Sequence, residues 1–233
     1  MIKFISTVTN IKNIASNTLL LSLTTPLEFT FQAGQFVTLY INNGIETKAR
    51  AYSILSPPHE KEKIDLCFKL VENGFASEVF SKTKIGDKFE MSGPFGNLLL
   101  QVDETKEREH VFIATGTGVV PFYSMLQEYV YNGKASWPKQ KFHLIFGLRH
   151  KNDIFLEQEW ALLQKKEPNF KLDIVLSREQ WPGKCGHVQQ HLPEDLSNKI
   201  FYLCGSGAMI EETKTLLQSK GVAKENIKIE RYY

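Results

Sequence analysis

The chain has 233 residues, of which 42% are hydrophobic and 23% charged, and its net charge is +2. This composition is typical of a globular protein, and the length fits one large domain or two of ordinary size. The small net charge gives no electrostatic case for binding nucleic acid. The chain has no run of 18 apolar residues, and its first residues do not read as a signal peptide. We therefore expect a cytoplasmic protein without a membrane span.

The three cysteines, Cys67, Cys185 and Cys204, are far apart in the sequence. They form no Cys-X-X-Cys motif, and an odd number of thiols fits a reducing compartment. A plant-type iron–sulfur cluster needs four thiolates at close spacing, which these residues cannot supply. We expect no metal site, so any electron transfer would use an organic cofactor or a cluster held by a partner.

The first hundred residues are rich in short β-type runs separated by turn signals. The predicted strands are 18–24, 36–41, 48–54 and 64–71, and the one predicted helix is 75–82. Several strands at this spacing predict a small antiparallel barrel, which removes exposed sheet edges by closing on itself. We assign residues 1–101 to this domain.

The pattern of predicted secondary structure changes after a charged segment at residues 103–109, which we interpret as a linker. Strands are predicted at 110–114, 141–146, 171–176, 200–204 and 226–231, and helices at 119–131, 154–166 and 208–220. Alternation of short apolar strands with helices predicts a doubly wound parallel sheet over residues 102–233. The fold class is therefore two-domain, an antiparallel β-barrel followed by an α/β domain.

The stretch Arg50-Ala51-Tyr52-Ser53 ends one predicted strand of the barrel. Its guanidinium can bind a pyrophosphate with two parallel hydrogen bonds, and its aromatic ring offers a flat face to a tricyclic ring. The Ser53 hydroxyl can hydrogen-bond a ring nitrogen. These residue types suit a flavin nucleotide, although the tetrapeptide alone is a weak signal.

The turn Gly116-Thr117-Gly118 lies between a predicted strand and a predicted helix. Its glycines let the backbone approach a phosphate at the helix N-terminus, and Pro121 is tolerated in the first helical turn. A tight strand-to-helix turn without a ligand is an equally good interpretation of this turn taken alone.

Cys204-Gly205 repeats this arrangement after a later strand, with Met209 in the helix that follows. The thiol is small enough to border a nicotinamide, although core packing is the commoner role of a lone cysteine. Ser177 and Arg178 also follow a strand, and together they suit a phosphate monoester such as the 2′-phosphate of NADP. Arg149 either joins them or is a solvated surface residue.

Two further motifs have both a structural and a functional interpretation. In the segment from Gly74 to Ser77, Ser77 is either a helix N-cap or part of a second pyrophosphate clamp opposite Arg50. At the chain end, Glu230 precedes Tyr232 and Tyr233, and two terminal aromatic rings indicate packing on a flat surface.

Taken in order, the motifs that contain Arg50, Gly74, Gly93-Pro94-Phe95-Gly96, Gly116, Ser177, Cys204 and Glu230 resemble those of the ferredoxin–NADP⁺ reductase superfamily over almost the entire chain. The resemblance implies an FAD-binding barrel followed by an NAD(P)-binding α/β domain. It implies FAD and NADP as cofactors, with NAD possible, and hydride transfer from nicotinamide C4 to flavin N5.

The resemblance also assigns residues to each ligand. FAD binding falls to Arg50, Ala51, Tyr52, Ser53, Gly74, Phe75, Ala76, Ser77, Thr117, Tyr232 and Tyr233. NADP binding falls to Gly116, Thr117, Gly118, Pro121, Arg149, Ser177, Arg178, Cys204, Gly205 and Met209. The implied catalytic residues are Ser53, Cys204 and Glu230.

Within these sets, the resemblance implies particular roles. Arg50 holds the FAD pyrophosphate, Tyr52 stacks on the isoalloxazine, and Ser53 lies near flavin N5. Cys204 lies beside the nicotinamide, and Glu230 orders hydrogen bonds on the flavin side. Tyr232 rather than Tyr233 is expected to cover the flavin ring.

One departure bears on nucleotide choice. His187 stands where some NADP-using relatives carry an arginine, and Lys184 is a candidate compensating charge with weaker geometry. The segment from Trp181 to His187 also resembles the corresponding segment of NADH oxidoreductase modules. The sequence therefore favours NADP over NAD only moderately.

The resemblance leaves three functions open: a reductase of ferredoxin or flavodoxin, the reductase component of an oxygenase or another electron-transfer complex, and a flavin-binding regulatory module without turnover. Joint presence of Ser53, Thr117, Cys204 and Glu230 argues against the last. We expect a monomer whose partner is an electron carrier. Six barrel lysines either steer an acidic partner or form an ordinary solvated surface: Lys48, Lys61, Lys63, Lys82, Lys84 and Lys88.

Overall fold

The structure is a computed structural model that describes residues 1–103, 105–131 and 140–232. By their contacts the residues divide into two compact units. The first comprises Met1–Leu100 with Val120–Tyr131, and the second comprises Gln101–Val119 with Asn132–Tyr233. The predicted domain boundary between residues 101 and 102 stays a prediction.

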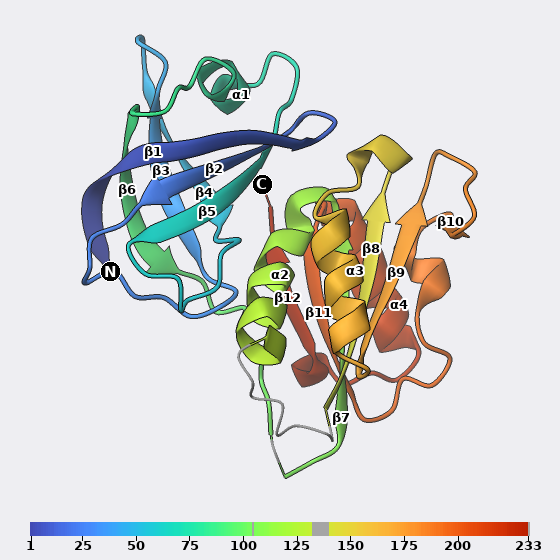
Figure 1. The fold of residues 1–233 in the computed structure, drawn as a ribbon. Helices are drawn as coiled ribbons and strands as arrows, with labels where there is room; N and C mark the ends of the chain where they lie inside the picture. The colour runs from blue at the N-terminus through green and yellow to red at the C-terminus, as the bar shows by residue number, and fades with distance from the viewer. Residues whose placement is uncertain (104, 132–139, 233) are drawn as a thin grey trace. The chain divides into compact units, whose positions relative to one another are not determined.

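The first unit is built on six antiparallel strands (Figure 1). They are β1 (Ile2–Ala15), β2 (Thr18–Thr24), β3 (Phe36–Asn42), β4 (Thr47–Ser53), β5 (Lys63–Lys69) and β6 (Lys88–Phe95). Their order is β4-β3-β6-β1-β2-β5, and an antiparallel bridge between Ile54 and Leu66 joins the two outer strands. The predicted antiparallel barrel is thereby confirmed.

Strand β1 takes part in both halves of the barrel. Its residues 2–7 pair with β6, and its residues from Val8 onward pair with β2, with register shifts at two points. The sequence analysis omitted β1 and β6. Most residues of β1 are exposed or half-buried, including Ile5 at 59% exposure, so its alternation carries a weak hydrophobic signal.

The barrel core is formed by inward residues of every strand and by one short helix, α1 (Phe75–Phe80). This helix ends two residues earlier than predicted. Its aromatic residue Phe80 is buried and packs with its ring centroid 4.1 Å from that of Phe68. The helix therefore belongs to the barrel core and fixes the segment that precedes it.

The second unit is a six-stranded sheet in which every pair is parallel (Figure 1). Its strands are β7 (Arg108–Thr115), β8 (Gln140–Leu148), β9 (Phe170–Leu176), β10 (Lys184–Cys185), β11 (Lys199–Gly205) and β12 (Ile227–Arg231). The order is β10-β9-β8-β7-β11-β12, so the chain winds outward in both directions from β7. This confirms the predicted doubly wound sheet. The strand β10, only two residues long, was not predicted.

The helical segments of the chain after β7 are more broken than predicted. The segment 119–131 consists of a 3₁₀ turn η1 (Gly116–Val119), the helix α2 (Val120–Leu126) and a π-helical turn η2 (Gln127–Tyr131). The helix α3 (Glu157–Lys166) starts three residues later than predicted, because Leu156 adopts a left-handed conformation with φ +57°. The helix α4 (Gly207–Ser219) agrees with the prediction within one residue. Three further 3₁₀ turns are η3 (Lys151–Asp153), η4 (Val188–His191) and η5 (Lys224–Asn226).

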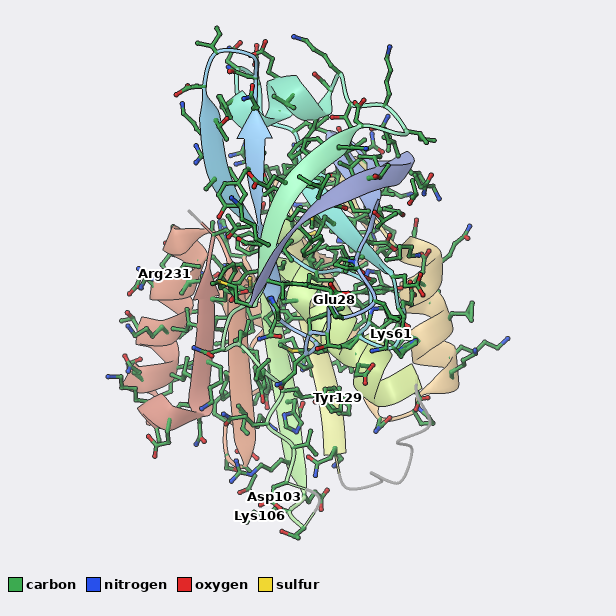
Figure 2. All side chains as sticks on the ribbon, turned by 90° about the vertical axis from the view of Figure 1, so that its left-hand side faces the viewer. Glu28, Lys61, Asp103, Lys106, Tyr129 and Arg231 are labelled. Carbon is green, nitrogen blue, oxygen red and sulfur yellow. The ribbon has the colours of Figure 1, made fainter. Side chains whose placement is uncertain are left out.

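The predicted linker is shorter than residues 103–109. Arg108 and Glu109 already belong to β7, where Glu109 pairs with Lys199 of β11 both in the backbone register and through an ion pair. Before the strand, Asp103 and Lys106 lie together and form an ion pair of 3.1 Å (Figure 2). In the described ranges, no helix is long and apolar enough to cross a membrane.

Candidate active site

The first group of predicted site residues lies on β4. Because side chains alternate along a strand, Lys48, Arg50 and Tyr52 share one face and Ala51 and Ser53 the other. Arg50 is exposed, and its Nη1 donates to the carbonyl oxygen of Ala49 at 2.9 Å. Its guanidinium is therefore accessible to an anion.

Tyr52 is half-buried against two rings of the barrel core. Its ring centroid lies 4.5 Å from that of Phe68 and 5.9 Å from that of Phe80, in edge-on geometry. Burial raises the pKa of Tyr52 to about 12, opposed by the nearby charge of Arg50. The ring is thus neutral and held from one side, as a stacking surface requires.

Ser53 is 4% exposed, and its backbone pairs with Phe36 of β3. It lies at the last position of β4, one residue beyond Tyr52 and on the opposite face. The predicted hydrogen bond from this hydroxyl to the flavin stays a prediction.

The segment from Gly74 to Ser77 lies at the start of α1. Gly74, not Ser77, occupies the N-cap position, so the interpretation of Ser77 as an N-cap is wrong. Ser77 is instead the third helical residue, and its Oγ accepts from the backbone N–H of Val71 at 2.8 Å. A Cβ at Gly74 would lie 3.0 Å from Ser77 Oγ and 3.0 Å from the carbonyl oxygen of Val71, so the tight turn favours glycine.

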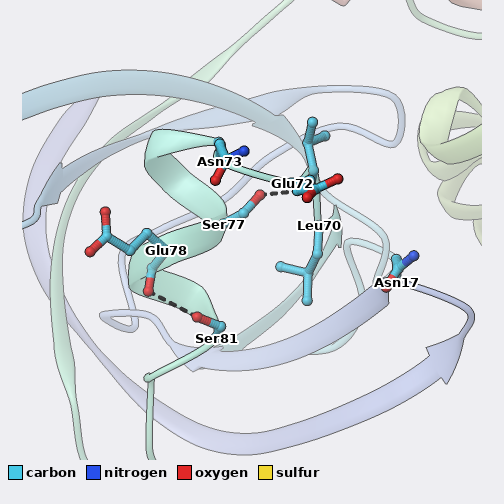
Figure 3. A pocket seen from close by; sticks show the side chains of 9 residues that line it. Asn17, Leu70, Glu72, Asn73, Ser77, Glu78 and Ser81 are labelled. Atoms are coloured by element: carbon cyan, nitrogen blue, oxygen red, sulfur yellow. Dashed lines mark hydrogen bonds between the residues drawn. The ribbon is translucent and has the colours of Figure 1, made fainter.

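A pocket of about 670 Å³ opens beside this turn (Figure 3). It is lined by Asn17, Leu70, Val71, Glu72, Asn73, Gly74, Ser77, Glu78 and Ser81. The predicted residues Gly74 and Ser77 therefore border a concave surface, whereas Arg50 and Tyr52 are not part of its lining. Glu72 and Glu78 make this pocket acidic. Among the predicted FAD-binding residues, the accessible cation is Arg50, which lies on β4 and not in the pocket.

The predicted glycine turn follows β7 and leads through η1 into α2. Gly116 has φ +56°, and Pro121 falls in the first turn of α2 as predicted. A Cβ at Gly118 would lie 2.3 Å from the carbonyl oxygen of Cys204 and 2.7 Å from the Cα of Gly205. This contact is possible only without a side chain, and it brings the predicted turns after β7 and β11 together.

A threonine that the sequence analysis did not single out strengthens this junction. The backbone N–H of Ser206 donates to Thr115 Oγ1 at 3.2 Å, and Gly205, with φ +143°, leaves room for that hydroxyl. Ser206 is the N-cap of α4 and accepts from the N–H of Met209 at 3.3 Å. The signal for Thr115 was present in the sequence, because it is the last residue of a strand that ends at the candidate site.

Cys204 is fully buried at the end of β11. Burial raises the pKa of its thiol, as does the nearby Glu230 carboxylate, whereas a hydrogen bond with Tyr232 lowers it. The Tyr232 hydroxyl also donates to the carbonyl oxygen of Thr117 at 3.3 Å. The structure thus gathers Thr117, Cys204, Glu230 and Tyr232 at one edge of the sheet. Tyr233 lies outside the described residues.

The three residues predicted for the 2′-phosphate also come together. Ser177 and Arg178 follow β9, and their backbone N–H groups donate to the carbonyl oxygens of Leu148 (2.9 Å) and Arg149 (3.0 Å) after β8. Arg149, Ser177 and Arg178 are exposed. Glu179 is the next residue, and its carboxylate accepts from the N–H of Lys151 at 2.8 Å. A carboxylate thus stands beside the two arginines.

The role of Lys184 as a compensating charge stays a prediction. Its Nζ lies 2.7 Å from Asp173 Oδ2, so the ammonium is already paired on the sheet. His187 is exposed, and its backbone N–H donates to Gln190 Oε1 at 2.9 Å. Among the residues predicted for the 2′-phosphate, Arg149 and Arg178 are exposed cations.

Comparisons with known proteins agree with this geometry. Residues 6–99 match the family described as "Oxidoreductase FAD-binding domain", and residues 112–215 match "Oxidoreductase NAD-binding domain". These matches coincide with the barrel and with the parallel sheet. A chain with this fold and these sites is a flavin-dependent NAD(P)H oxidoreductase.

Among curated proteins, ferredoxin–NADP reductase B of Sorangium cellulosum is 34% identical over 88% of this chain and 86% of its own length. The electron transfer component of anthranilate 1,2-dioxygenase from Acinetobacter baylyi is 29% identical over 99% of this chain and 67% of its own length. Of the phenol 2-monooxygenase reductase component DmpP from Pseudomonas sp., at 29% identity, the chain spans 58%. The chain belongs to the ferredoxin–NADP⁺ reductase superfamily.

Solved structures show the same fold. The Amycolatopsis reductase GcoB is 25% identical, with a TM-score of 0.88 over 99% of this chain and 69% of that one. A ferredoxin NADP⁺ reductase from Neisseria gonorrhoeae, solved with bound FAD and NADP, is 21% identical, with a TM-score of 0.84 over 99% of both chains. By its two family matches and its 34% identical relative, the protein is an oxidoreductase that transfers electrons from or to NAD(P)H with FAD as cofactor.

Proposed function

We propose that this chain passes electrons from NADPH through FAD to a one-electron carrier protein of the ferredoxin or flavodoxin type. The observation that carries the proposal is the 34% identity to a ferredoxin–NADP reductase at nearly matching length. When bound, FAD accepts a hydride at N5 and can release electrons one at a time. A chain whose three cysteines cannot hold a plant-type cluster must deliver those electrons to another centre.

In this proposal the residues of the first unit bind and orient the cofactor. Arg50 pairs with the pyrophosphate, Tyr52 supplies the stacking face, and Ser53 hydrogen-bonds near N5. The support is that the Arg50 guanidinium is exposed and that Tyr52 is held edge-on by Phe68 and Phe80. Ala51, Gly74, Phe75, Ala76 and Ser77 complete the FAD set.

Residues of the second unit, together with Pro121 of α2, bind and orient the nucleotide. Gly116, Thr117, Gly118, Pro121, Gly205 and Met209 shape the turn region, and Cys204 and Glu230 border the nicotinamide. The support is the Gly118–Cys204 approach and the hydrogen bond from Tyr232 to Thr117. Because Tyr232 contacts both Thr117 and Cys204, it either covers the reacting ring or moves when the nicotinamide binds.

The preference for NADPH is proposed to come from Arg149 and Arg178, with the Ser177 hydroxyl. Two exposed guanidinium groups on adjoining segments suit a dianionic monoester. Glu179 opposes them, because a carboxylate repels phosphate and can accept from a ribose hydroxyl. We therefore expect an NADPH preference that is real but moderate.

The test measures kcat/KM for NADPH and NADH in the parent chain, Arg178→Ala and Arg149→Ala. Loss of a charge-assisted contact predicts a fall of roughly tenfold or more for NADPH and little change for NADH. Glu179→Gln is expected to shift the preference further toward NADPH. The matched control is Arg108→Ala, since Arg108 begins β7 at the opposite end of the sheet strands. Equal losses with both nucleotides in Arg178→Ala would remove the assignment.

A second candidate is the reductase component of an oxygenase, favoured by the dioxygenase and monooxygenase relatives. The chain spans only 58% of DmpP, so the activity of such a longer protein does not transfer directly. The two candidates differ in acceptor. Steady-state reduction of a panel of ferredoxins and flavodoxins, compared with a Rieske-type oxygenase component, separates them, because the proposal predicts the higher kcat/KM with the small carriers.

Three of the six barrel lysines considered for partner binding are already paired with carboxylates. Lys48, Lys63 and Lys82 each have a carboxylate within 3.1 Å, from Glu46, Glu60 and Glu78. Exposed pairs of this kind cancel much of the local charge. We therefore expect acceptor reduction to depend only weakly on salt, in agreement with the interpretation of these lysines as an ordinary solvated surface.

A further inference from the structure

Two contacts connect β4 to α1 on the face that carries Arg50. At one end, Lys48 Nζ lies 4.6 Å from the centroid of the Phe75 ring. At the other end, the Tyr52 ring packs on that of Phe80. Phe75 and Phe80 are the first and last residues of α1, and Arg50 lies between Lys48 and Tyr52 on the strand. Arg50 is thus bracketed by two side chains that α1 holds in place.

Lys48 is placed to act on the same ligand as Arg50. Residues two apart on a strand point to the same side at a separation of roughly 6.6–6.8 Å, which is within reach of two long side chains. The Lys48 side chain is 38% exposed, so its ammonium is accessible. Its carboxylate partner, Glu46, is 2.6 Å away and 51% exposed, which makes the ion pair a weak, water-screened one that a stronger anion can replace.

The Phe75 ring gives Lys48 a fixed position that the ion pair alone does not provide. The Phe75 ring packs on the barrel core and stays in place. Its attraction for the Lys48 ammonium therefore persists when a ligand anion replaces Glu46 as the partner of that ammonium. A lysine restrained in this way loses less conformational entropy when it binds a ligand.

We propose that Lys48 is a second cation for the pyrophosphate of FAD and that Phe75 is its positioning residue. Arg50 and Lys48 together match the two negative charges of a pyrophosphate, to which the Gly74–Ser77 segment adds no cation. The inference depends on FAD binding by the barrel and not on which nucleotide or electron acceptor the enzyme uses.

The barrel contains a close structural match that serves as the control. Lys3 Nζ lies 4.7 Å from the centroid of the Tyr40 ring and 2.7 Å from Glu90 Oε1. It is therefore the same kind of lysine–ring–carboxylate group, but on β1 and away from Arg50. Lys3→Met and Lys48→Met remove the same charge from the same domain.

The experiment measures the dissociation constant of FAD for the full chain freed of flavin, from flavin fluorescence at low and high salt. Lys48→Met is expected to weaken FAD binding about five- to tenfold at low salt and much less at high salt. Lys48→Arg is expected to restore most of the affinity, Phe75→Leu to give an intermediate loss, and Lys3→Met to leave it unchanged.

Three results would overturn the proposal: unchanged affinity in Lys48→Met, a loss of the same size at both salt concentrations, or an equal loss in Lys3→Met. Thermal unfolding of each flavin-free variant is measured in parallel. Since Lys48 is at the surface, its replacement should leave that midpoint in place. A lowered midpoint together with a salt-independent loss would assign Lys48 a structural role instead.

Discussion

Replacing Gly118 by alanine tests the junction on which the nucleotide site depends. The added Cβ would lie 2.3 Å from the carbonyl oxygen of Cys204, 2.6 Å from its carbonyl carbon and 2.7 Å from the Cα of Gly205. All three are backbone atoms of buried residues at the end of β11, so no side-chain rotation relieves the contact. Either η1 or the end of β11 must move.

Overpacking of this kind costs about 1–3 kcal/mol, and we expect the upper part of that range because the neighbours are backbone. With a urea m-value of about 2 kcal/mol/M, the unfolding midpoint should fall by about 1 M. Tryptophan fluorescence follows urea unfolding of this unit, because Trp160, 1% exposed on α3, and Trp181 both belong to it. We also expect weaker NADPH binding, because the turn carries the predicted phosphate contacts.

The matched control is Gly207→Ala, in the corresponding strand-to-helix turn after β11. A Cβ there meets nothing within 4 Å, and the residue is the first of α4. Alanine should therefore leave stability unchanged or raise it by up to about 1 kcal/mol. If Gly118→Ala is as stable as Gly207→Ala, the close approach between the two turns is wrong.

Two further predictions concern titration. The His143 side chain is 5% exposed, and its ring nitrogens lie 2.7 Å from Asp173 and 3.7 Å from Glu109. Burial lowers the pKa of His143, although both carboxylates raise it. With a lowered pKa in the folded state, His143 binds a proton more readily in the unfolded chain. Its contribution to the free energy of unfolding is therefore complete above the unfolded pKa of about 6.5 and is lost as the pH falls through the folded pKa. Urea unfolding followed by Trp160 should thus show lower stability at about pH 5.5 than at about pH 7.5, with a smaller difference in His143→Gln; an equal difference in both would contradict the assignment. Among the three thiols, burial raises the pKa of Cys67 to about 12 and also raises that of Cys204, whereas Cys185 is half-buried. A disulfide reagent should therefore modify Cys185 alone in the native chain and all three thiols in denaturant, and rapid modification of Cys204 would show that β11 is more open than described.

The sequence predicted the second unit better than the first, for a physical reason. Strands such as β7 and β11 are buried on both faces and appear as continuous apolar runs. Strand β1 is only partly buried and changes partner midway, from β6 to β2. Its hydrophobic residues therefore follow neither the two-residue period of a strand nor the 3.6-residue period of a helix. The late start of α3 depends on a left-handed Leu156, which no local propensity indicates.

The sequence predicted the parts of the candidate site that depend on the order of the strands. It did not predict the contacts that depend on which side chains pack together in the folded chain. Arg178 and Arg149 meet because both follow parallel strands that end at the same edge. The pairing of Lys184 with Asp173 instead requires the two-residue strand β10, and that of Lys48 with Phe75 requires the packing of α1. Contacts of this second kind depend on tertiary structure and leave no signal in the local sequence.

The most direct test of the account is anaerobic reduction of the FAD-loaded chain by NADPH and by NADH. The account predicts that the purified chain retains FAD, that NADPH bleaches the flavin absorbance, and that a ferredoxin or flavodoxin restores it. A chain that binds no FAD, or whose flavin keeps its absorbance with both nucleotides, would contradict it.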